Sequence, residues 1–286
     1  MRKILVTGLT GHLGKNLAKK LNKYFDTYSL QRKKIFDYEN IKEIKCDLGK
    51  ESKEDIIKKI PKGIDTILYL AQSRNYRNFP EKSKDIFNIN IKIPFWLLQY
   101  CLKNNIKRFI YTSTGEIKYS TKKKNRNNNF YQCTKFSFEK LISNFDKYLD
   151  VSILRLFYLY SNIENNGLVN SLVNKINNDE IITLNGSRNG DLIHITHAED
   201  CANFILFIMR KNISGILDLA PQRRISIRSL SERIAKRINK KVKFFIKKSE
   251  MSSETCVSLK KTKKYKSNYK FRSPEEGLKK LNFFRN

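Results

Sequence analysis

Hydrophobic and polar positions in the first half of the chain alternate between short apolar runs and longer amphipathic stretches. The apolar runs predict strands at residues 3–7, 27–30, 66–70, 108–112 and 151–156, with a weaker strand around Ile44. The amphipathic stretches predict helices at residues 12–23, 53–60, 85–104 and 130–145. In the first of these, Leu13, Leu17 and Leu21 recur with helical spacing on one face. Strands and helices in this order are typical of parallel βαβ units.

The alternation becomes less regular beyond about residue 161. Helices are expected there at residues 167–177, 199–209, 226–238 and 274–281. No internal repeat and no linker rich in Pro, Gly or Ser separates the two halves. We therefore expect an α/β fold, a doubly wound parallel sheet of the Rossmann type at residues 1–160 with a smaller C-terminal α/β substrate lobe at residues 161–286. The chain is free to cross between these lobes.

A glycine-rich turn, Thr7-Gly8-Leu9-Thr10-Gly11-His12-Leu13-Gly14, connects the first predicted strand to the first predicted helix. Glycines permit a tight turn and close approach of the backbone, and the helix N-terminus presents free N–H groups to a pyrophosphate. An ordinary strand-to-helix turn is the alternative. The position of this turn at the first strand, ahead of a second one, favours dinucleotide binding through Gly8, Thr10, Gly11, His12, Leu13 and Gly14.

The end of the second predicted strand indicates which dinucleotide is preferred. An acidic residue there binds the ribose hydroxyls of NAD, whereas a basic residue accommodates the extra phosphate of NADP. The sequence places Arg32, followed by two lysines, at this point and no acid. NADP is therefore the expected cofactor, with NAD as the alternative. Asp47 is a candidate contact for the adenine ring, and capping of a turn or helix is its alternative role.

Tyr131 and Lys135 lie four residues apart at the start of a predicted helix, so that both side chains fall on one face. An ammonium group beside a phenol lowers the pKa of the phenol, which makes the tyrosine a usable proton donor and acceptor. Tyr119 and Lys123 have the same spacing, but a polar loop follows them, whereas an apolar helical pattern follows Tyr131. Thr114 or Ser113, which follow the strand predicted at residues 108–112, could bind the reacting oxygen of a substrate.

Composition limits the classes of protein to consider. Hydrophobic residues make up 40% of the 286 residues, enough for a substantial core. The net charge of +31 suggests a polyanionic partner, but the lysines are spread over nearly every segment, which indicates a bias of the whole chain. Nucleic acid is therefore not an expected partner. The densest basic run, residues 122–129, has no interleaved aromatic residues for stacking on bases.

The five cysteines are widely spaced and show no metal-ligand spacing with the three histidines. Reduced thiols and no metal site are the simplest interpretation. No apolar run approaches the roughly 18 residues needed to cross a bilayer, and the chain enters an apolar strand within its first residues. A cytoplasmic protein without membrane insertion is the resulting expectation.

Together these motifs resemble the extended short-chain dehydrogenase/reductase family, the nucleotide-sugar epimerases and dehydratases, over nearly the whole chain. The glycine turn resembles the family's T-G-x-x-G-x-x-G, residues 46–48 its adenine-contacting G-D-L, and residues 65–71 its fourth strand. Residues 113–117 resemble its S-S/T-x-x-V segment, which assigns the catalytic hydroxyl to Thr114. The resemblance implies catalytic roles for Thr114, Tyr131 and Lys135. It also implies cofactor contacts from Leu48, Leu70, Ala71, Gln72, Tyr131 and Lys135.

The resemblance continues through other positions. Asn90 falls where the family has a structural asparagine, and Glu139 at an acidic position downstream of the Tyr-Lys pair. In the second half, residues 195–202 resemble the H-V-x-D-x-A element, with His197 and Asp200 at its marked positions. The family also implies a homodimer formed through the long helices.

Departures from the family pattern concern the substrate side. Gly115 occupies the position of the acid that expels water in dehydratases, while Glu116 is retained, as in sugar-acid decarboxylases of the family. Tyr158 stands where asparagine is common, and Gly190 replaces an arginine expected to bind the nucleotide diphosphate, with Arg188 as a substitute. Glu116, Tyr158 and Arg188 are therefore the candidate substrate-binding residues.

The sequence thus predicts an NAD(P)-dependent nucleotide-sugar epimerase or 4-keto reductase with a Thr-Tyr-Lys site. A dehydratase or decarboxylase of the same family is one alternative. A catalytically idle dinucleotide-binding protein that uses its positive charge to bind RNA or another polyanion is a second, from a different class of function.

Overall fold

The computed structural model describes residues 1–120, 129–162, 167–248, 252–255, 257–258 and 269–282. They form two compact units, between which the chain passes several times. The first unit contains residues 1–117, 128–155 and 202–217, and the second contains residues 118–127, 156–201 and 218–286. The predicted division into two lobes at residue 160 stays a prediction. Most of the basic run at 122–129, Lys123 included, lies outside the described residues.

The first unit is built on a seven-stranded sheet with the order β12-β7-β5-β4-β1-β2-β3. Adjacent strands from β3 to β5 pair in parallel. The strands are β1 (Lys3–Thr7), β2 (Asp26–Gln31), β3 (Ile41–Lys45), β4 (Thr66–Tyr69), β5 (Arg108–Thr114), β7 (Asp150–Leu156) and β12 (Gly215–Leu219). The order reverses between β1 and β4, which is the point where doubly wound sheets bind ligands. The predicted Rossmann-type fold is confirmed.

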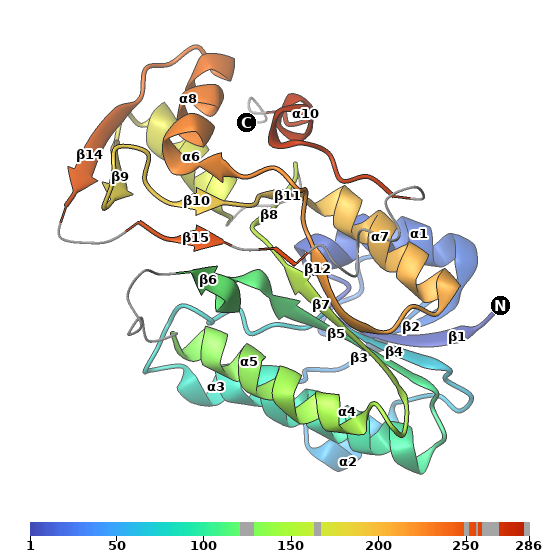
Figure 1. Cartoon of the computed structure of the whole chain (residues 1–286). Coiled ribbons are helices and arrows are strands. Elements are labelled where there is room, and N and C mark those ends of the chain that lie inside the picture. The colour runs from blue at the N-terminus through green and yellow to red at the C-terminus, as the bar shows by residue number, and fades with distance from the viewer. Residues whose placement is uncertain (121–128, 163–166, 249–251, 256, 259–268, 283–286) are drawn as a thin grey trace. The chain divides into compact units, whose positions relative to one another are not determined.

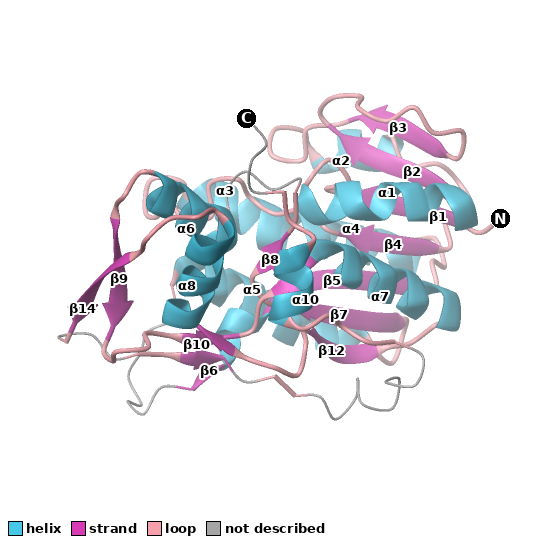
Figure 2. Ribbon diagram, turned by 90° about the horizontal axis from the view of Figure 1, so that it is seen from above, coloured by secondary structure: helices cyan, strands magenta, loops and turns pink. Residues whose placement is uncertain are grey.

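Helices cover both faces of this sheet, with α1 and α7 on one face and α3, α4 and α5 on the other (Figure 1 and Figure 2). Their bounds are α1 (His12–Tyr24), α2 (Lys53–Lys58), α3 (Ser83–Phe87), η1 (Asn88–Lys92), α4 (Ile93–Lys103), α5 (Phe130–Ile142) and α7 (Ala198–Lys211), with short 3-10 turns η2 (Gly115–Lys118) and η3 (Ser143–Phe145). The predicted apolar face of α1 is buried through Leu13, Leu17 and Leu21.

The helix predicted at residues 85–104 is interrupted by one π-helical segment, η1. The sequence explains it, because Pro94 has no N–H to donate and its ring crowds the carbonyl four residues earlier. Two carbonyl groups of η1 accept hydrogen bonds from tyrosines of the sheet instead. The Tyr69 hydroxyl donates to Ile89 O at 2.5 Å, and the Tyr111 hydroxyl donates to Asn90 O at 3.2 Å.

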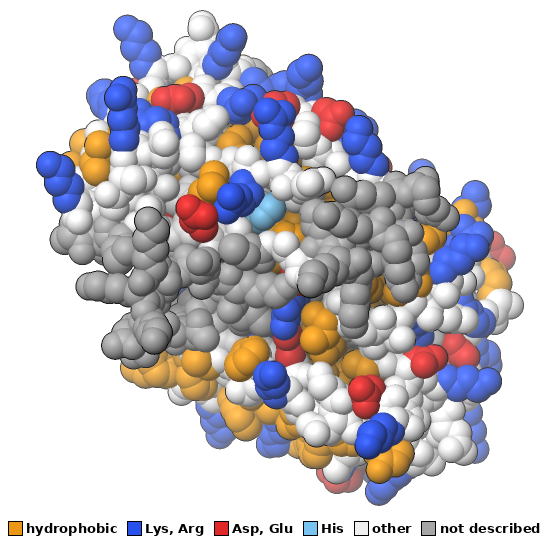
Figure 3. All heavy atoms as spheres, in the orientation of Figure 1, with side chains coloured by type: hydrophobic (Ala, Val, Ile, Leu, Met, Phe, Trp, Pro, Cys, Tyr) orange, Lys and Arg blue, Asp and Glu red, His pale blue; other side chains and the backbone are white. Residues whose placement is uncertain are grey.

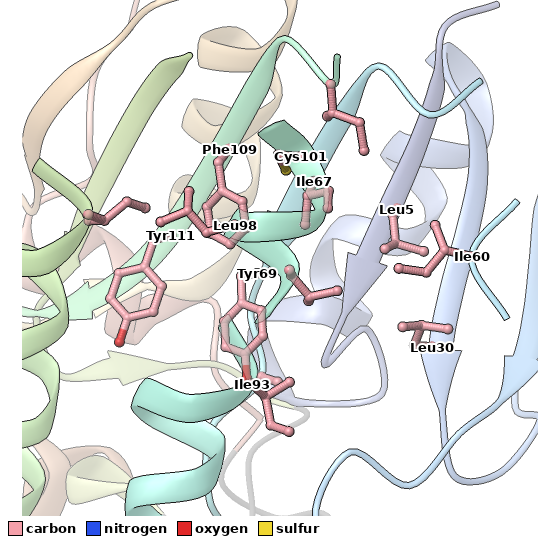
Figure 4. Packing of buried hydrophobic residues seen from close by; sticks show 14 of the residues in the cluster. Leu5, Leu30, Ile60, Ile67, Tyr69, Ile93, Leu98, Cys101, Phe109 and Tyr111 are labelled. Atoms are coloured by element: carbon pink, nitrogen blue, oxygen red, sulfur yellow. The ribbon is translucent and has the colours of Figure 1, made fainter. Parts of the chain in front are cut away.

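The core of the first unit lies between the sheet and α2, α4 and α5. Figure 4 shows Tyr69, Phe109 and Tyr111 of the central strands packed with Leu98 and Cys101 of α4. Tyr69 and Tyr111 are completely buried and their rings stack at a centroid distance of 6.0 Å. Every residue of β5 is buried, so the end of this strand, at Thr114, is held firmly.

The second unit has its own apolar core, made by α6, α8 and the strands beside them. Its helices are α6 (Leu168–Asn177), α8 (Ile227–Arg237) and α10 (Pro274–Lys279). Its strands form a four-stranded sheet and two pairs, namely β13 (Ile225–Ser226), β10 (Leu192–Ile193), β15 (Glu254–Thr255) and β6 (Tyr119–Ser120), then β11 (Thr196–His197) with β8 (Leu159–Tyr160), and β14 (Lys243–Lys247) with β9 (Ile181–Asn185).

Residues 215–219 form β12 at the edge of the main sheet, next to β7, so the chain crosses back to the first unit here. The preceding helix, α7, covers that sheet (Figure 1). The sequence does not predict this pairing, since a short apolar strand does not reveal its pairing partner.

Charged side chains are distributed broadly. Lys and Arg side chains are spread over the face that Figure 3 shows, with Asp and Glu among them, instead of forming one basic patch. Within the described part of the chain, no helix combines the length and the apolar character that a membrane crossing requires.

Candidate active site

The glycine turn lies at the switch point of the sheet, where the ends of β1 and β4 meet. Gly8 has a positive φ of 75°, and a Cβ atom on it would lie 2.7 Å from Ala71 N. A Cβ on Gly14 would lie 2.3 Å from Leu9 O. Because such distances are shorter than any real Cβ contact, the turn can be this tight only with glycine at both positions.

The beginning of α1 is suited to a phosphate group. Gly11 is the N-cap and supplies no side-chain hydrogen bond, and the first turn contains no acidic residue. No N-cap side chain therefore competes for the N–H groups of the first turn, which lie next to the point where the backbones of Gly8 and Ala71 approach closely. This cradle fits the pyrophosphate of a dinucleotide, as the sequence predicts for residues 8–14.

Arg32 directly follows β2 and is exposed, together with Lys33 and Lys34. Sequence reasoning did not anticipate Glu43 on β3, which lies beside this tip. One of its carboxylate oxygens accepts hydrogen bonds from the side-chain amide of Gln31 and from the backbone N–H groups of Ile35, at 2.9 Å, and Phe36, at 3.2 Å. Glu43 thus fixes the loop that carries the three basic residues.

Asp47 and Leu48 follow β3 at the same edge of the sheet. The Asp47 carboxylate accepts a hydrogen bond from Gly49 N at 3.1 Å, and its carbonyl accepts one from Lys50 N at 3.0 Å. These bonds give Asp47 the turn-capping role that the sequence offered as its alternative. Leu48 packs against the core of the first unit. A contact of either residue with an adenine ring stays a prediction.

Thr114 and Tyr131 come together in the first unit. The Thr114 side chain lies close enough to the Tyr131 hydroxyl to lower its pKa, and the Tyr131 hydroxyl donates to Gln72 Oε1 at 3.4 Å. Asn129 caps α5 by accepting from Gln132 N at 2.9 Å, which fixes the helical turn that carries Tyr131. Burial and the negative charge of Glu116 raise the pKa of Tyr131, and the Thr114 side chain opposes this. The phenol is therefore protonated at neutral pH.

Lys135 lies one turn further along α5 and is 1% exposed. Its ammonium group donates to Thr112 O at 3.0 Å and lies 4.8 Å from the centroid of the Tyr111 ring. Burial lowers the pKa of Lys135 to about 7. The spacing of the pair predicts that Lys135 lowers the pKa of Tyr131; in this structure burial and Glu116 outweigh any such effect, and the lysine is bound to the end of β5.

Glu116 is held beside the Thr-Tyr pair. Its backbone N–H donates to Thr114 Oγ1 at 3.2 Å, and its carboxylate accepts from Gln132 Nε2 at 3.1 Å. Burial raises the pKa of Glu116, while the bond from Gln132 and the positive charge of Arg77 lower it. Glu116, a carboxyl group with opposing influences on its pKa, therefore lies near Tyr131, the proposed proton-transfer residue. Ser113, the other candidate hydroxyl, is buried, and its Oγ has no hydrogen-bond partner among the described residues.

Asn90 connects η1 to α5. It is fully buried, and its side-chain amide donates to Thr134 Oγ1 at 3.0 Å. Thr134 in turn donates to Tyr131 O at 2.8 Å. The asparagine that the family resemblance singled out therefore supports the helix of Tyr131 and Lys135 from the π-helical segment.

Tyr158 and Arg188 belong to the second unit, so their roles in substrate binding stay predictions. Tyr158 has a positive φ of 32° between β7 and β8. Arg188 is exposed on a turn, and its carbonyl accepts from Arg228 Nε at 2.5 Å. Gly190, with a φ of 67°, completes this turn.

His197 and Asp200 also lie in the second unit, at the start of α7. The Arg272 guanidinium contacts His197 Nδ1 at 3.1 Å and Asp200 Oδ1 at 3.3 Å. The element that the resemblance marked thus anchors the segment ahead of α10, which is a structural role. Within the described ranges no three His, Cys, Asp or Glu side chains gather as metal ligands, and the four cysteines there form no disulfide.

Several solved structures have a similar fold and share 20% sequence identity or less with this chain. They include UDP-N-acetylglucosamine 4-epimerase from Methanobrevibacter ruminantium M1 in complex with UDP-N-acetylmuramic acid (18% identity, TM-score 0.79, covering 99% of this chain and 98% of that one). UDP-glucuronic acid 4-epimerase from Bacillus cereus in complex with UDP-glucuronic acid and NAD has 20% identity and a TM-score of 0.77. The match covers 97% of this chain and 96% of that one. UDP-glucose 4-epimerase from Thermus thermophilus in complex with NAD has 17% identity and a TM-score of 0.77. The match covers 98% of this chain and 97% of that one.

Among curated proteins, dTDP-D-glucose 4,6-dehydratase from Dictyostelium discoideum is 30% identical over 158 residues. The match covers 50% of this chain and 36% of the length of that relative. The model of the NAD dependent epimerase/dehydratase family matches residues 4–218, which include the glycine turn, Thr114 and the Tyr131–Lys135 pair. The chain therefore belongs to the NAD dependent epimerase/dehydratase family and is an enzyme of that family.

Proposed function

We propose that this protein is a nicotinamide-dependent nucleotide-sugar epimerase or 4-keto reductase, and that Thr114, Tyr131 and Lys135 are its catalytic residues. The observation that carries the proposal is the closeness of the Thr114 and Tyr131 side chains, with Lys135 buried one helical turn beyond Tyr131, in the same unit as the glycine turn. A hydroxyl pair, a lysine and a dinucleotide cradle on one sheet are the groups that interconversion of an alcohol and a ketone requires.

Residues 8–14 would hold the pyrophosphate of the dinucleotide, and Leu70, Ala71 and Gln72 at the end of β4 would contact it. The bound cofactor supplies reversible hydride transfer at a sugar carbon. Tyr131 exchanges the proton of the sugar oxygen at its hydroxyl, and Thr114 donates a hydrogen bond to the same oxygen. Lys135, when protonated, contributes positive charge one helical turn beyond Tyr131. The raised pKa of Tyr131 makes the phenol a proton donor at the start, the state that reduction of a ketone needs.

NADP is the cofactor that we propose from the tip of β2. Arg32, Lys33 and Lys34 are exposed there, and the nearby Glu43 carboxylate is already engaged by three N–H donors. The loop thus retains positive charge for the additional phosphate of NADP. The UDP-glucose 4-epimerase from Thermus thermophilus and the UDP-glucuronic acid 4-epimerase from Bacillus cereus are both in complex with NAD, which makes NAD the alternative.

A dehydratase is the second candidate, because the curated relative is a 4,6-dehydratase. Glu116 offers a half-buried carboxyl near Tyr131 for removal of a proton next to the ketone. Gly115 provides no acid to protonate the departing hydroxyl, however, and this favours epimerase or reductase.

The homodimer implied by the family would use the α3–α5 face, where Phe87 and Phe136 are 46% and 40% exposed. Size-exclusion chromatography with light scattering would test this dimer.

The experiment is a panel of UDP-, dTDP-, GDP- and CDP-sugars with NAD, NADP and their reduced forms, followed by product chromatography. An epimerase yields an isomer without net consumption of cofactor, a reductase oxidises one reduced cofactor per product, and a dehydratase yields a product that has lost water. Tyr131→Phe should lower turnover about 10²- to 10⁴-fold, the usual contribution of a positioned proton-transfer group. Tyr119→Phe is the matched control, and equal turnover in the Tyr131 variant would remove this residue from the mechanism.

A further inference from the structure

The segment after β4, residues 72–80, is fixed in place by polar contacts. Asp85 of α3 accepts hydrogen bonds from the Ser73 hydroxyl and from Asn75 Nδ2, the latter at 3.1 Å. Asn75 O accepts from Asn78 N at 2.8 Å, which closes a turn. The side chains between these points are therefore presented in a defined direction although they lie in a loop.

Two aromatic contacts pack the same segment against the first turn of α5. The Tyr76 ring lies 5.2 Å from the Tyr131 ring at an interplanar angle of 57°, and the Phe79 ring stacks on Phe130 at 4.8 Å. Aromatic pairs in such geometries are favourable by about 0.5–1.5 kcal/mol each. The segment thus forms a side of the site that includes the proposed catalytic tyrosine.

Arg77 is the cation of this segment that reaches the site. Its guanidinium lies 5.1 Å from the centroid of the Tyr76 ring, and its positive charge lowers the pKa of Glu116. The Arg77 side chain is exposed. A guanidinium beside Tyr76 and within electrostatic range of Glu116 is thus available to an anion that enters next to Tyr131.

We propose that Arg77 binds a carboxylate on the sugar ring, so that the substrate class is a nucleotide-linked uronic acid. The inference rests on the proposed function, with Tyr131 acting at the 4-oxygen of the sugar. The carboxylate of a hexuronic acid is attached to the ring carbon next to that position, whereas the diphosphate is attached across the ring. A cation near Tyr131 therefore meets the carboxylate, and the planar guanidinium matches a carboxylate with two parallel hydrogen bonds.

The test compares UDP-glucuronic acid with UDP-glucose in the wild-type protein and in Arg77→Gln, Arg77→Lys and Arg74→Gln. Arg74 is exposed in the same segment and serves as the control. We expect the wild-type protein to prefer UDP-glucuronic acid. Arg77→Gln should lower kcat/KM for that substrate about 10- to 100-fold more than for UDP-glucose, the usual value of a charge-assisted pair. Arg77→Lys should recover part of the loss, and Arg74→Gln should behave like wild type.

Equal losses with both substrates in Arg77→Gln would overturn the inference and point to the diphosphate as the group bound. A wild-type preference for UDP-glucose would also overturn it, while leaving the proposed function intact. Absence of turnover with every sugar in the panel would instead overturn the proposed function itself. Calorimetric titration of both UDP-sugars into wild type and Arg77→Gln gives the same comparison for affinity, independently of turnover.

Discussion

The Arg155 guanidinium at the end of β7 binds the Glu139 carboxylate of α5 through two nitrogens, Nε at 2.9 Å and Nη2 at 2.5 Å. Glu139 is 2% exposed and lies one helical turn beyond Lys135. Its negative charge raises the pKa of Lys135, in opposition to the larger lowering by burial. The ion pair therefore orients α5 on the sheet. Its carboxylate also partly offsets the lowering of the pKa of Lys135, the proposed catalytic lysine, by burial.

Glu139→Gln should lower the free energy of unfolding by about 3–5 kcal/mol, because it removes the carboxylate that balances the largely buried Arg155 cation. Urea unfolding followed by circular dichroism measures this loss. The double variant Glu139→Gln, Arg155→Met should lose less than the sum of the two single variants, since neither residue then remains unpaired. A loss below about 1 kcal/mol in the single variant would contradict the assigned role of the pair.

Lys135 should give the stability of the protein a distinct pH dependence. Its pKa is about 7 in the folded protein against 10.5 as the ordinary value. Between these limits the unfolded chain holds a proton that the folded protein lacks, so the free energy of unfolding rises with pH. One residue contributes a slope of up to about 1.4 kcal/mol per pH unit in this window, and none below pH 7.

The matching variant is Lys135→Met, which keeps the length of the side chain and removes the titrating group. Urea unfolding of both proteins at a series of pH values from 6 to 10 isolates the contribution of Lys135, because all other groups cancel in the difference. We expect wild type to gain stability relative to the variant as the pH rises. Parallel stability curves would show that the lysine titrates normally in the fold.

Arg32→Gln should weaken binding of NADP about tenfold relative to NAD, because it removes one cation from the loop after β2 without changing the glycine turn. Fluorescence titration with both reduced cofactors measures the ratio of dissociation constants. Lys19→Gln, which removes an exposed cation from the middle of α1, controls for net charge. Equal changes for the two cofactors would contradict a role for Arg32 in selection.

The sequence predicted the features that depend on local spacing. The glycine turn, α1 and the position of Tyr131 and Lys135 on one helix all depend on residues close together in the chain, so periodicity and turn chemistry are enough to predict them. The predicted helix at 85–104 exists, but the effect of Pro94 on η1 also required the tyrosines of β4 and β5. Their hydroxyl groups reach the freed carbonyl groups only in the folded sheet.

The features that the sequence missed all depend on pairing across the fold. Glu43 lies beside the tip of β2 because β3 pairs with β2 in a register that aligns Glu43 with Ser29. Arg155 meets Glu139 because β7 and α5 pack together. The same holds for β12, whose place at the edge of the main sheet is set by long-range pairing. The residue types at these positions do not identify their partners, so no local signal predicts the pairing.

Gly8→Ala should abolish dinucleotide binding and destabilise the fold, for two separable reasons. Alanine at a φ of 75° is strained, and its Cβ would lie 2.7 Å from Ala71 N, which belongs to the rigid end of β4. Gly63→Ala is the matched control. Gly63 has a similar φ of 79°, but its added Cβ would meet only Lys3 Cδ, at 3.9 Å. The control should therefore lose only the roughly 1–3 kcal/mol of backbone strain and keep its affinity. Thermal unfolding with and without NAD and NADP measures both effects, and a Gly8 variant that retains the cofactor-dependent rise in Tm would show that the pyrophosphate binds elsewhere.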